Sequence, residues 1–204
     1  HLDLACGTGP HVRHFLDAGF QSGGLDINQP MLDKAAIRCP EAHFAVQDMC
    51  AFHLDEPVDL ITCFLYSLHY SATVERLAAC IARVHGALRP GGLFCFNTVD
   101  RTRIDNRLFA AHTVDVDEGR FTFSSGWHYS GAGERQSLRL RIEKTAGDET
   151  LIWNDEHPMV AVSFAELEAL LQPHFELHVL AHDYQRILPI GLGAGNALFA
   201  CVKR

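Results

Sequence analysis

A glycine-containing segment near the start of the chain has residue types and spacing suited to binding a nucleoside. Gly7 and Gly9 lie between an apolar stretch at residues 1–5, which predicts a β-strand, and a helix expected at residues 10–18. Glycines between a strand and a helix let the backbone approach a bound nucleotide closely. A Gly-x-Gly pair alone fits several kinds of cofactor, so the residues around it decide between them.

Three side chains near this segment narrow the choice of cofactor. The third glycine of a dinucleotide-binding fingerprint is absent, because Val12 occupies its place. Asp3 puts a carboxylate at the strand end, which would repel a pyrophosphate and attract the positively charged amino and sulfonium groups of S-adenosylmethionine. Asp26, at the tip of a strand expected at residues 22–25, is placed to accept hydrogen bonds from two ribose hydroxyls. The alternative for Asp26 is a cap on the next helix.

Residues 2–100 resemble the class I S-adenosylmethionine-dependent methyltransferases in five motifs that occur in the family's order. The motifs are Asp3-Leu4-Ala5-Cys6-Gly7-Thr8-Gly9, Leu25-Asp26-Ile27-Asn28, Gln29-Pro30-Met31-Leu32-Asp33-Lys34-Ala35, Gln47-Asp48-Met49 and Leu88-Arg89-Pro90-Gly91-Gly92. The resemblance implies S-adenosylmethionine as the cofactor, S-adenosylhomocysteine as its product and methyl transfer as the reaction. The implied cofactor contacts are Asp3, Ala5, Cys6, Gly7, Gly9, Asp26, Ile27, Met31, Asp48, Met49 and Phe64. The alternatives are solvated loop carboxylates for Asp3 and Asp26, and core packing for Met31.

Strand-like and helical patterns alternate through the first hundred residues, which is typical of βαβ units in a parallel sheet. The expected strands are residues 1–5, 22–25, 43–46, 60–64, 93–97, 177–181 and 197–203, and the expected helices are residues 10–18, 30–39, 74–88 and 163–171. Ser163 with Glu166 predicts a capping box for the last helix, and residues 89–92 predict a hard turn. We expect an α/β, Rossmann-like, doubly wound sheet of seven strands, mostly parallel, with the last strand antiparallel.

Between residues 113 and 162 the pattern changes to alternating apolar residues with several glycines, which predicts antiparallel strands. We interpret the chain as one methyltransferase-like domain, with a core at residues 1–100 and 161–204 and a β-rich insertion at residues 101–160 over the active site. The chain opens inside a strand, so the sequence suggests that an N-terminal segment covering the cofactor is missing.

The composition favours a small-molecule partner. The net charge of -8 and the pI of about 5.9 argue against binding nucleic acid through phosphate neutralisation. No apolar run of 18 or more residues and no signal peptide occur, which argues against membrane insertion and secretion. The 7 cysteines include no Cys-x-x-Cys pair and indicate reduced thiols in a cytoplasmic protein. A homodimer stays open.

Histidine is the natural proton acceptor near neutral pH if the methyl acceptor is a protonated amine or a hydroxyl. His69 and Tyr66 follow the fourth expected strand, and His128 lies in the insertion. The insertion and the C-terminal part resemble, more loosely, aminosugar N,N-dimethyltransferases and glycine N-methyltransferase-like enzymes. That resemblance, through the spacing to Gly133, implies an active-site role for His128. We predict His128, His69 and Tyr66 as catalytic residues; surface or packing positions are the alternative for both histidines.

Other patterns are weaker. His174, His178 and His182 recur every four residues, but they span a helix-to-strand transition, so we predict no metal site. Arg186 could pair with an acidic substrate or lie on the surface. A nicotinamide-dependent oxidoreductase would need a hydride-transfer pair such as Tyr-x-x-x-Lys, which the sequence lacks, and a non-catalytic cofactor-binding domain stays open. The sequence names no acceptor and leaves nitrogen, oxygen and carbon methylation open.

Overall fold

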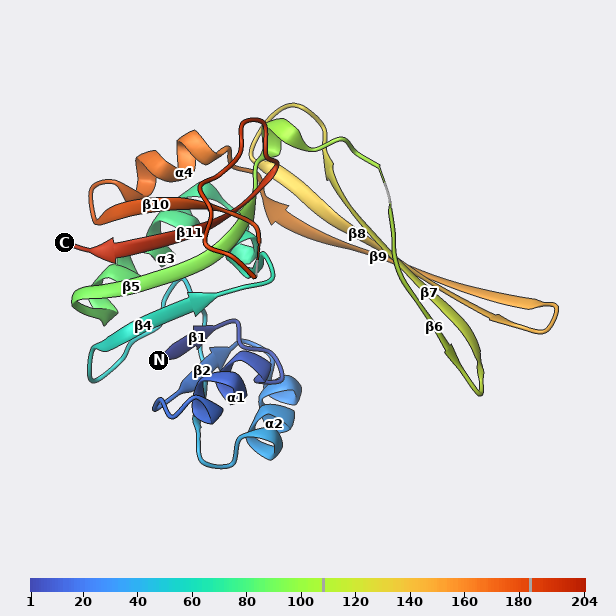
Figure 1. The fold of residues 1–204 in the computed structure, drawn as a ribbon, viewed down its shortest axis with the longest axis horizontal. Helices are drawn as coiled ribbons and strands as arrows, with labels where there is room; N and C mark the ends of the chain where they lie inside the picture. Colours follow the sequence, from blue (N-terminus) through green and yellow to red (C-terminus); the bar gives the residue numbers. More distant parts are fainter. Residues whose placement is uncertain (108, 184) are drawn as a thin grey trace.

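The fold consists of a large sheet covered by helices and a smaller sheet that extends away from it (Figure 1). The structure is a computed structural model and describes residues 1–107, 109–183 and 185–204. The large sheet has 7 strands in the order β10-β11-β5-β4-β1-β2-β3, and the small sheet has 4 strands in the order β6-β7-β8-β9.

The large sheet and its helices are formed by β1 (Leu2–Leu4), α1 (Pro10–Asp17), β2 (Gly23–Asp26), α2 (Gln29–Arg38), β3 (His43–Val46), β4 (Val58–Cys63), the 3₁₀ helix η1 (Ser67–Ser71), α3 (Val74–Ala87), β5 (Leu88–Val99), the short 3₁₀ helix η2 (Arg101–Arg103), α4 (Phe164–Leu171), β10 (Phe175–Ala181) and β11 (Asn196–Lys203). Neighbouring strands from β3 to β5 are parallel. Strand β11 is antiparallel to both β5 and β10. The predicted seven-stranded, Rossmann-like sheet with an antiparallel last strand is confirmed.

Strand order explains why the sheet is covered on both faces. From β1 the chain moves outward through β2 to β3, and from β4 it moves in the opposite direction to β5. Because crossovers between parallel strands are right-handed, the two directions place α1 and α2 on one face and α3 on the other. The predicted capping box of α4 is also present: the Ser163 side chain accepts a hydrogen bond from the Glu166 N–H, and the Glu166 side chain accepts one from the Ser163 N–H.

Strand β5 begins earlier than the sequence predicts. The expected turn at residues 89–92 lies inside β5, where the pairing with β4 shifts from Val58 opposite Leu88 to Leu60 opposite Leu93. Gly91 takes a φ of 74° in this irregularity. The prediction of a strand limited to residues 93–97 was therefore wrong, because the extra residues form a bulge that lets pairing resume on both sides.

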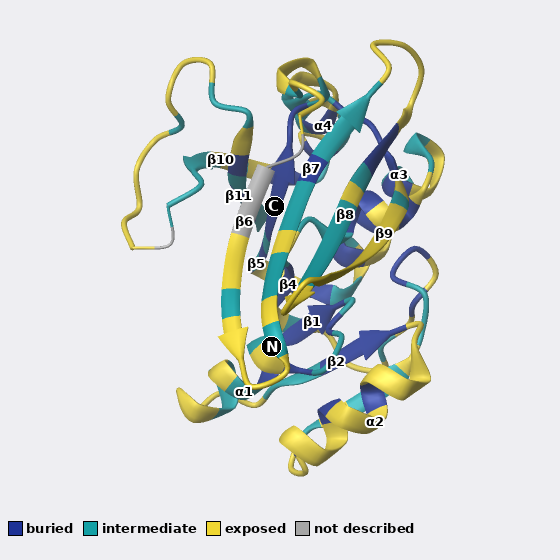
Figure 2. Ribbon diagram, turned by 90° about the vertical axis from the view of Figure 1, so that its right-hand side faces the viewer, coloured by how far each residue is buried: buried dark blue, intermediate teal, exposed yellow. Residues whose placement is uncertain are grey.

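Buried residues gather in the central strands of the large sheet, whereas the distal ends of β6 and β9 are exposed (Figure 2). All 7 cysteines are free, and all except Cys95 are buried. Among the described residues, no helix is long and apolar enough to cross a membrane.

The insertion is an antiparallel sheet of β6 (Phe109–Val116), β7 (Gly119–Tyr129), β8 (Arg135–Ala146) and β9 (Glu149–Val160). Its register places Trp127 opposite Leu138 and Gly126 opposite Arg139. Because consecutive side chains of a strand point to opposite faces, Trp127 and Leu138 lie on one face and Arg139 on the other. The Trp127 face is the one that meets the large sheet, since the Trp127 ring lies 5.1 Å from the ring of Tyr66.

Candidate cofactor and acceptor site

A cavity of ≈ 430 Å³ lies at the carboxyl ends of the parallel strands β1, β2 and β3, where an open α/β sheet binds its ligands. It is lined by Ala5, Gly7, Leu25, Asp26, Ile27, Asn28, Met31, Gln47, Asp48, Met49, Ser67, Tyr70 and Arg76. The predicted cofactor residues Ala5, Gly7, Asp26, Ile27, Met31, Asp48 and Met49 are thus brought together. The other predicted contacts, Asp3, Cys6, Gly9 and Phe64, do not line this cavity.

The Asp26 carboxylate joins the glycine loop to the end of β2. Its Oδ2 accepts a hydrogen bond from the Gly7 N–H at 2.9 Å, and its Oδ1 accepts one from the Asn28 N–H at 2.8 Å. Helix α2 is capped by the Asn28 side chain, which accepts from the Met31 N–H at 3.1 Å. Asp26 is therefore not the helix cap, and its carboxylate stays fixed at the cavity wall.

Asp3 is buried below the loop and does not present its charge to the cavity as the sequence argument expected. Its side chain is 1% exposed, its Oδ1 accepts from the Thr62 hydroxyl at 2.6 Å, and its Oδ2 lies 3.3 Å from His11 Nδ1. The hydrogen bond with Asp3 raises the pKa of His11, whose ring also meets the edge of the Phe64 ring at 5.3 Å. Sequence reasoning missed His11, which lies on the first turn of α1 beside the Asp3 carboxylate.

Cys6 and Gly9 shape the loop from below rather than facing the cavity. Cys6 is 3% exposed and packs in a buried cluster with Val12. Gly9 precedes α1 with a φ of 76°, and a Cβ there would lie 3.2 Å from Ala35 Cβ. Both residues therefore fix the path of the backbone between β1 and α1.

Arg76 forms part of the cavity wall next to Asp48, and no sequence motif pointed to this arginine. Arg76 Nη2 lies 2.6 Å from Asp48 Oδ2. The Cys50 backbone N–H and then the Arg76 guanidinium lower the pKa of Asp48. Asp48 therefore stays ionised beside the cavity.

Tyr66 lies next to the cavity at the end of β4, in a strained backbone conformation. Leu65 and Tyr66 both have positive φ values, 54° and 62°, which cost energy for residues other than glycine. The Tyr66 N–H donates to Asn97 Oδ1 at 3.2 Å, and its ring lies 5.9 Å from that of His182. With Trp127 of the insertion, these residues form a cluster that we call the Tyr66 cluster: Tyr66, Asn97, Trp127 and His182.

His69 is a buried residue with a structural role, so the prediction that it is a catalytic residue was wrong. It is 2% exposed, and its Nδ1–H donates to the Val160 carbonyl at 2.8 Å. Its Nε2 accepts from the Thr98 hydroxyl at 2.9 Å and from the Val99 N–H at 3.3 Å. Both ring nitrogens are occupied by protein groups, so His69 ties η1 to β5 and β9 and cannot reach a substrate.

Burial lowers the pKa of His69 to about 4 from an ordinary value of 6.5, and this predicts an acid-sensitive fold. The unfolded chain binds more protons than the folded chain between these pH values, so the stabilisation is complete above pH 6.5 and is lost as pH falls toward 4. We expect the free energy of unfolding to fall by about 3 kcal/mol through His69 as the pH is lowered from 6.5 to 4. Urea unfolding at several pH values should show this loss, and the His69→Gln variant should have a flatter profile. Parallel profiles would contradict it.

His128 lies away from the Tyr66 cluster. It follows Trp127 on β7, so its side chain points to the opposite face of the insertion sheet. Its Nδ1 is buried and has no hydrogen-bond partner among the described residues. The structure therefore does not bring His128 together with Tyr66, because neighbouring residues on a strand cannot share a face.

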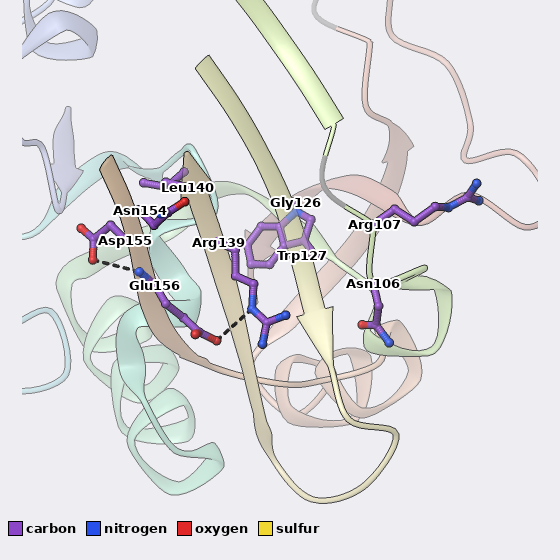
Figure 3. Close-up of a pocket in the computed structure, with 9 residues that line it drawn as sticks. All are labelled: Asn106, Arg107, Gly126, Trp127, Arg139, Leu140, Asn154, Asp155 and Glu156. Carbon is purple, nitrogen blue, oxygen red and sulfur yellow. Dashed lines mark hydrogen bonds and ion pairs between the residues drawn. The ribbon is translucent and has the colours of Figure 1, made fainter. Parts of the chain in front are cut away.

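A second cavity, of ≈ 450 Å³, lies in the insertion (Figure 3). It is lined by Asn106, Arg107, Gly126, Trp127, Arg139, Leu140, Asn154, Asp155 and Glu156. Arg139 Nε lies 3.2 Å from Glu156 Oε1, whereas the Arg107 side chain points away from the other labelled residues. Trp127 belongs both to this cavity and to the Tyr66 cluster, so the two adjoin.

The three regularly spaced histidines, His174, His178 and His182, lie in different parts of the structure. The His174 ring lies 4.9 Å from that of His85, His178 Nε2 lies 3.5 Å from Glu176 Oε1, and His182 joins the Tyr66 cluster. In the described parts of the chain, no group of 3 or more His, Cys, Asp or Glu side chains could hold a metal ion. Arg186 pairs with Asp183 at 3.0 Å.

Comparison with known proteins gives consistent matches. A family model described as a methyltransferase domain matches residues 2–92. A dTDP-3-amino-3,4,6-trideoxy-alpha-D-glucopyranose N,N-dimethyltransferase from Streptomyces venezuelae is 31% identical over 59% of this chain and 56% of that protein. A dTDP-4-amino-2,3,4,6-tetradeoxy-D-glucose N,N-dimethyltransferase from Saccharopolyspora spinosa is 36% identical over 45% of this chain and 37% of that protein. The chain thus spans only part of the length of these relatives.

Solved structures match over the entire chain. The crystal structure of DesVI from Streptomyces venezuelae has a TM-score of 0.80 and 26% identity, covering 100% of this chain and 82% of that one. An S-adenosylmethionine-bound amino pentose methyltransferase from Micromonospora echinaspora has a TM-score of 0.85 and 20% identity, with the same coverage. Taken with the sheet order, these matches show that residues 2–92 are similar to a methyltransferase domain and that the whole chain has the fold of these two methyltransferase structures.

Proposed function

We propose that this chain transfers a methyl group from S-adenosylmethionine to a nitrogen atom of a small molecule. The observation that carries the proposal is the cavity at the ends of β1 to β3, where the Asp26 carboxylate is fixed against the glycine loop. The printed names of the relatives, which are sugar N,N-dimethyltransferases, support nitrogen as the acceptor atom and an amino sugar as the acceptor class.

The cavity residues fit an adenosine group. The Asp26 carboxylate keeps lone pairs beyond those used by Gly7 and Asn28, and these would accept from ribose hydroxyls. Ile27 and Met31 are large apolar side chains that are 74% and 44% exposed, and a flat purine lying on them would bury this surface. The adenine would lie beside Asp48 and Met49.

The sulfonium supplies an activated methyl group when the cofactor is bound, so the chain must mainly align the acceptor and exclude water. The loop before α1, with Phe64 and His11 beside it, would orient the methionine part. The Tyr66 cluster lies next along the sheet edge and would receive the acceptor nitrogen. The second cavity, in the insertion, would then hold the body of the acceptor, since the Trp127 indole ring and the side-chain amides of Asn106 and Asn154 suit a sugar.

The function is tested by incubating the protein with S-adenosylmethionine and each of the two dTDP-amino sugars named for the relatives. Two quantities are measured: the release of S-adenosylhomocysteine, and the mass of the sugar product by mass spectrometry. We expect mono- and dimethylated amines. Binding of the cofactor without a mass increase of any amine would contradict the proposal. The cytoplasmic location, the homodimer, the absence of a nucleic-acid partner and the domain limits stay predictions.

Loss of the Arg76 charge should weaken cofactor binding modestly. Arg76 holds Asp48 at the cavity wall, and exposed ion pairs contribute up to about 1 kcal/mol, so Arg76→Gln should lower affinity about threefold to fivefold. Isothermal titration calorimetry with S-adenosylhomocysteine measures this change. Arg89→Gln, which breaks the 2.8 Å pair with Asp59 away from the cavity, is the matched control. A gain in affinity for Arg76→Gln would mean that Arg76 competes with the ligand.

A further inference from the structure

Three polar side chains in a row connect the two cavities of the protein. Tyr70 lines the cofactor cavity, and Asp155 lines the second cavity, in the insertion (Figure 3). His157 lies between them: the Tyr70 hydroxyl contacts His157 Nδ1, and His157 Nε2 lies 3.1 Å from Asp155 Oδ2. We call Tyr70, His157 and Asp155 the Tyr70 triad. In the proposed function one cavity holds the cofactor and the other the body of the acceptor, so the triad runs from one ligand site to the other.

We propose that the Tyr70 triad removes a proton from the ammonium form of the acceptor before methyl transfer. One N–H bond of the ammonium group breaks, and its proton goes to the Tyr70 oxygen. The Tyr70 O–H bond breaks in the same step, and that proton goes to His157 Nδ1. The N–H electron pair stays on nitrogen as the lone pair that accepts the methyl group. This assignment rests on the proposed function, because it requires an amine acceptor.

The contacts assign one arrangement of hydrogens to the triad. The ionised Asp155 carboxylate can only accept, so His157 Nε2 carries a hydrogen and donates it. His157 Nδ1 then has a lone pair, and the Tyr70 hydroxyl donates to it. A hydroxyl oxygen keeps two lone pairs beside its O–H bond, so Tyr70 can still accept a hydrogen bond from a ligand in the cofactor cavity. This is the arrangement in which a Ser-His-Asp triad activates its hydroxyl group.

The surroundings of the triad stabilise the charge after the proton has moved. The imidazolium formed at His157 would lie 3.1 Å from the Asp155 carboxylate. The side chains of His157 and Asp155 are 32% and 71% exposed, so the proton can pass on to water after each turnover. Burial, and then the Asp155 charge, raise the pKa of Tyr70, which therefore keeps its own proton at neutral pH until His157 takes it.

Tyr70 is held from both sides within η1. The residue before it, His69, donates to the Val160 carbonyl of β9 at 2.8 Å. The carbonyl of the residue after it, Ser71, accepts from Arg76 Nε at 3.1 Å. The Tyr70 backbone is therefore fixed against β9 on one side and α3 on the other.

Strand β9 supplies the other two members of the triad. His157 and Asp155 lie two residues apart on β9, so their side chains point to the same face of the insertion sheet. That face is the Trp127 face, because His157 is opposite Leu138 and Leu138 is opposite Trp127. The triad therefore lies on the side of the insertion that meets the large sheet.

The other ionisable side chains near the cofactor cavity do not suit this role. Asp26 is assigned to the ribose, and Asp48 pairs with Arg76 at 2.6 Å. His69 is bonded to protein groups at both ring nitrogens. Among the described residues that line the cavity, Tyr70 is the one whose side chain contacts an imidazole ring. It alone joins the cavity to a group that takes up protons near neutral pH.

The kinetic test compares the wild type with Tyr70→Phe, His157→Gln and the variant that combines them. The probes are S-adenosylmethionine and the two dTDP-amino sugars. Tyr70→Phe keeps the ring and removes the hydroxyl, so we expect kcat to fall about 100-fold. KM for the amino sugar and affinity for S-adenosylhomocysteine should stay within about threefold. His157→Gln should lower kcat similarly, and the double variant should be about as slow as the single ones, because the residues act as a unit.

Two variants outside the cavities serve as matched controls. The Tyr129 hydroxyl donates to the Gly133 carbonyl at 2.9 Å, and His178 Nε2 lies 3.5 Å from Glu176 Oε1. Neither Tyr129 nor His178 lines the cofactor cavity or the second cavity. Tyr129→Phe and His178→Gln should therefore keep the wild-type kcat.

Nuclear magnetic resonance follows the proton itself. Binding of an amino sugar to the S-adenosylhomocysteine complex should move the ring C–H signals of His157 toward the imidazolium position in the wild type and not in Tyr70→Phe. The signals are identified by their loss in His157→Gln. The assignment is overturned if these signals do not move, or if Tyr70→Phe keeps kcat within about threefold of the wild type. If the wild type binds the cofactor but methylates neither amine, the proposed function fails, and the assignment fails with it.

Discussion

Replacing Asp26 with alanine is expected to lower the affinity for S-adenosylmethionine about 100-fold or more. The carboxylate accepts from the Gly7 and Asn28 N–H groups at 2.9 and 2.8 Å, and its other lone pairs face the cavity. Hydrogen bonds to a charged group contribute about 1.5–3 kcal/mol each, so two ribose contacts account for a loss of this size. Titration calorimetry measures the affinity, and Asp26→Asn should give an intermediate value.

Asp33→Ala is the control for this prediction. Asp33 lies on α2, is exposed, and accepts from Gln29 Nε2 at 2.7 Å, outside the cavity. Its variant should bind the cofactor within twofold of the wild type. If Asp26→Ala bound equally well, the ribose would not lie at the end of β2, and the placement of the cofactor would have to change.

Adding one methyl group at Gly24 is expected to destabilise the fold by about 3 kcal/mol and to weaken cofactor binding. A Cβ at Gly24 would lie 2.6 Å from Cys6 Sγ and 2.7 Å from Cys6 Cβ. Cys6 cannot give way by rotating, since its Cβ is fixed by the backbone of the glycine loop. Overpacking a buried site costs about 1–3 kcal/mol or more, and here the strain moves the loop itself. Thermal unfolding of Gly24→Ala, with calorimetry, measures both effects.

Gly86→Ala provides the opposite case. Gly86 lies in α3, and a Cβ there would have nothing within 4 Å. Alanine in a helix is favoured over glycine by about 0.5–1 kcal/mol, so this variant should be slightly more stable and bind the cofactor normally. Equal stability of the two variants would show that β2 does not pack on the loop as described.

The fold could be predicted from the sequence because its signals are local. Each βαβ unit shows a short apolar run, a turn residue and a helical pattern within a few tens of residues, and the cap residue Ser163 lies next to the helix that it starts. Residues 88–99 were harder to predict. Pro90 and the glycines beside it are typical of a turn, and only pairing with β4 keeps them within a strand.

Most of the predicted cofactor residues line one cavity, whereas the predicted catalytic residues do not come together, for a physical reason. The cofactor residues sit at the ends of consecutive strands, so motif order brings them together. The roles of Asp3 and His69 depend on partners such as Thr62 and Val160, far away in the sequence. His182 comes beside Tyr66 only because β10 pairs with β11, and no spacing in the sequence reveals that pairing.

One signal in the insertion could have been used at the outset. Trp127 and His128 are neighbours on a strand, so they must point to opposite faces. Choosing the apolar Trp127 for the face toward the large sheet places His128 on the opposite face of β7, as the structure shows. The resemblance to aminosugar enzymes pointed to this segment and could not decide which of the two adjacent side chains lies beside Tyr66.

The most direct test of the central claim is a calorimetric titration of the protein with S-adenosylmethionine, S-adenosylhomocysteine and NAD. We expect the first two to bind at one site per chain, with S-adenosylhomocysteine competing for the same site and Asp26→Ala abolishing most of the heat. NAD should give no binding, because the third fingerprint glycine is replaced by Val12. Saturable binding of NAD, with no binding of either S-adenosyl compound, would contradict the assignment.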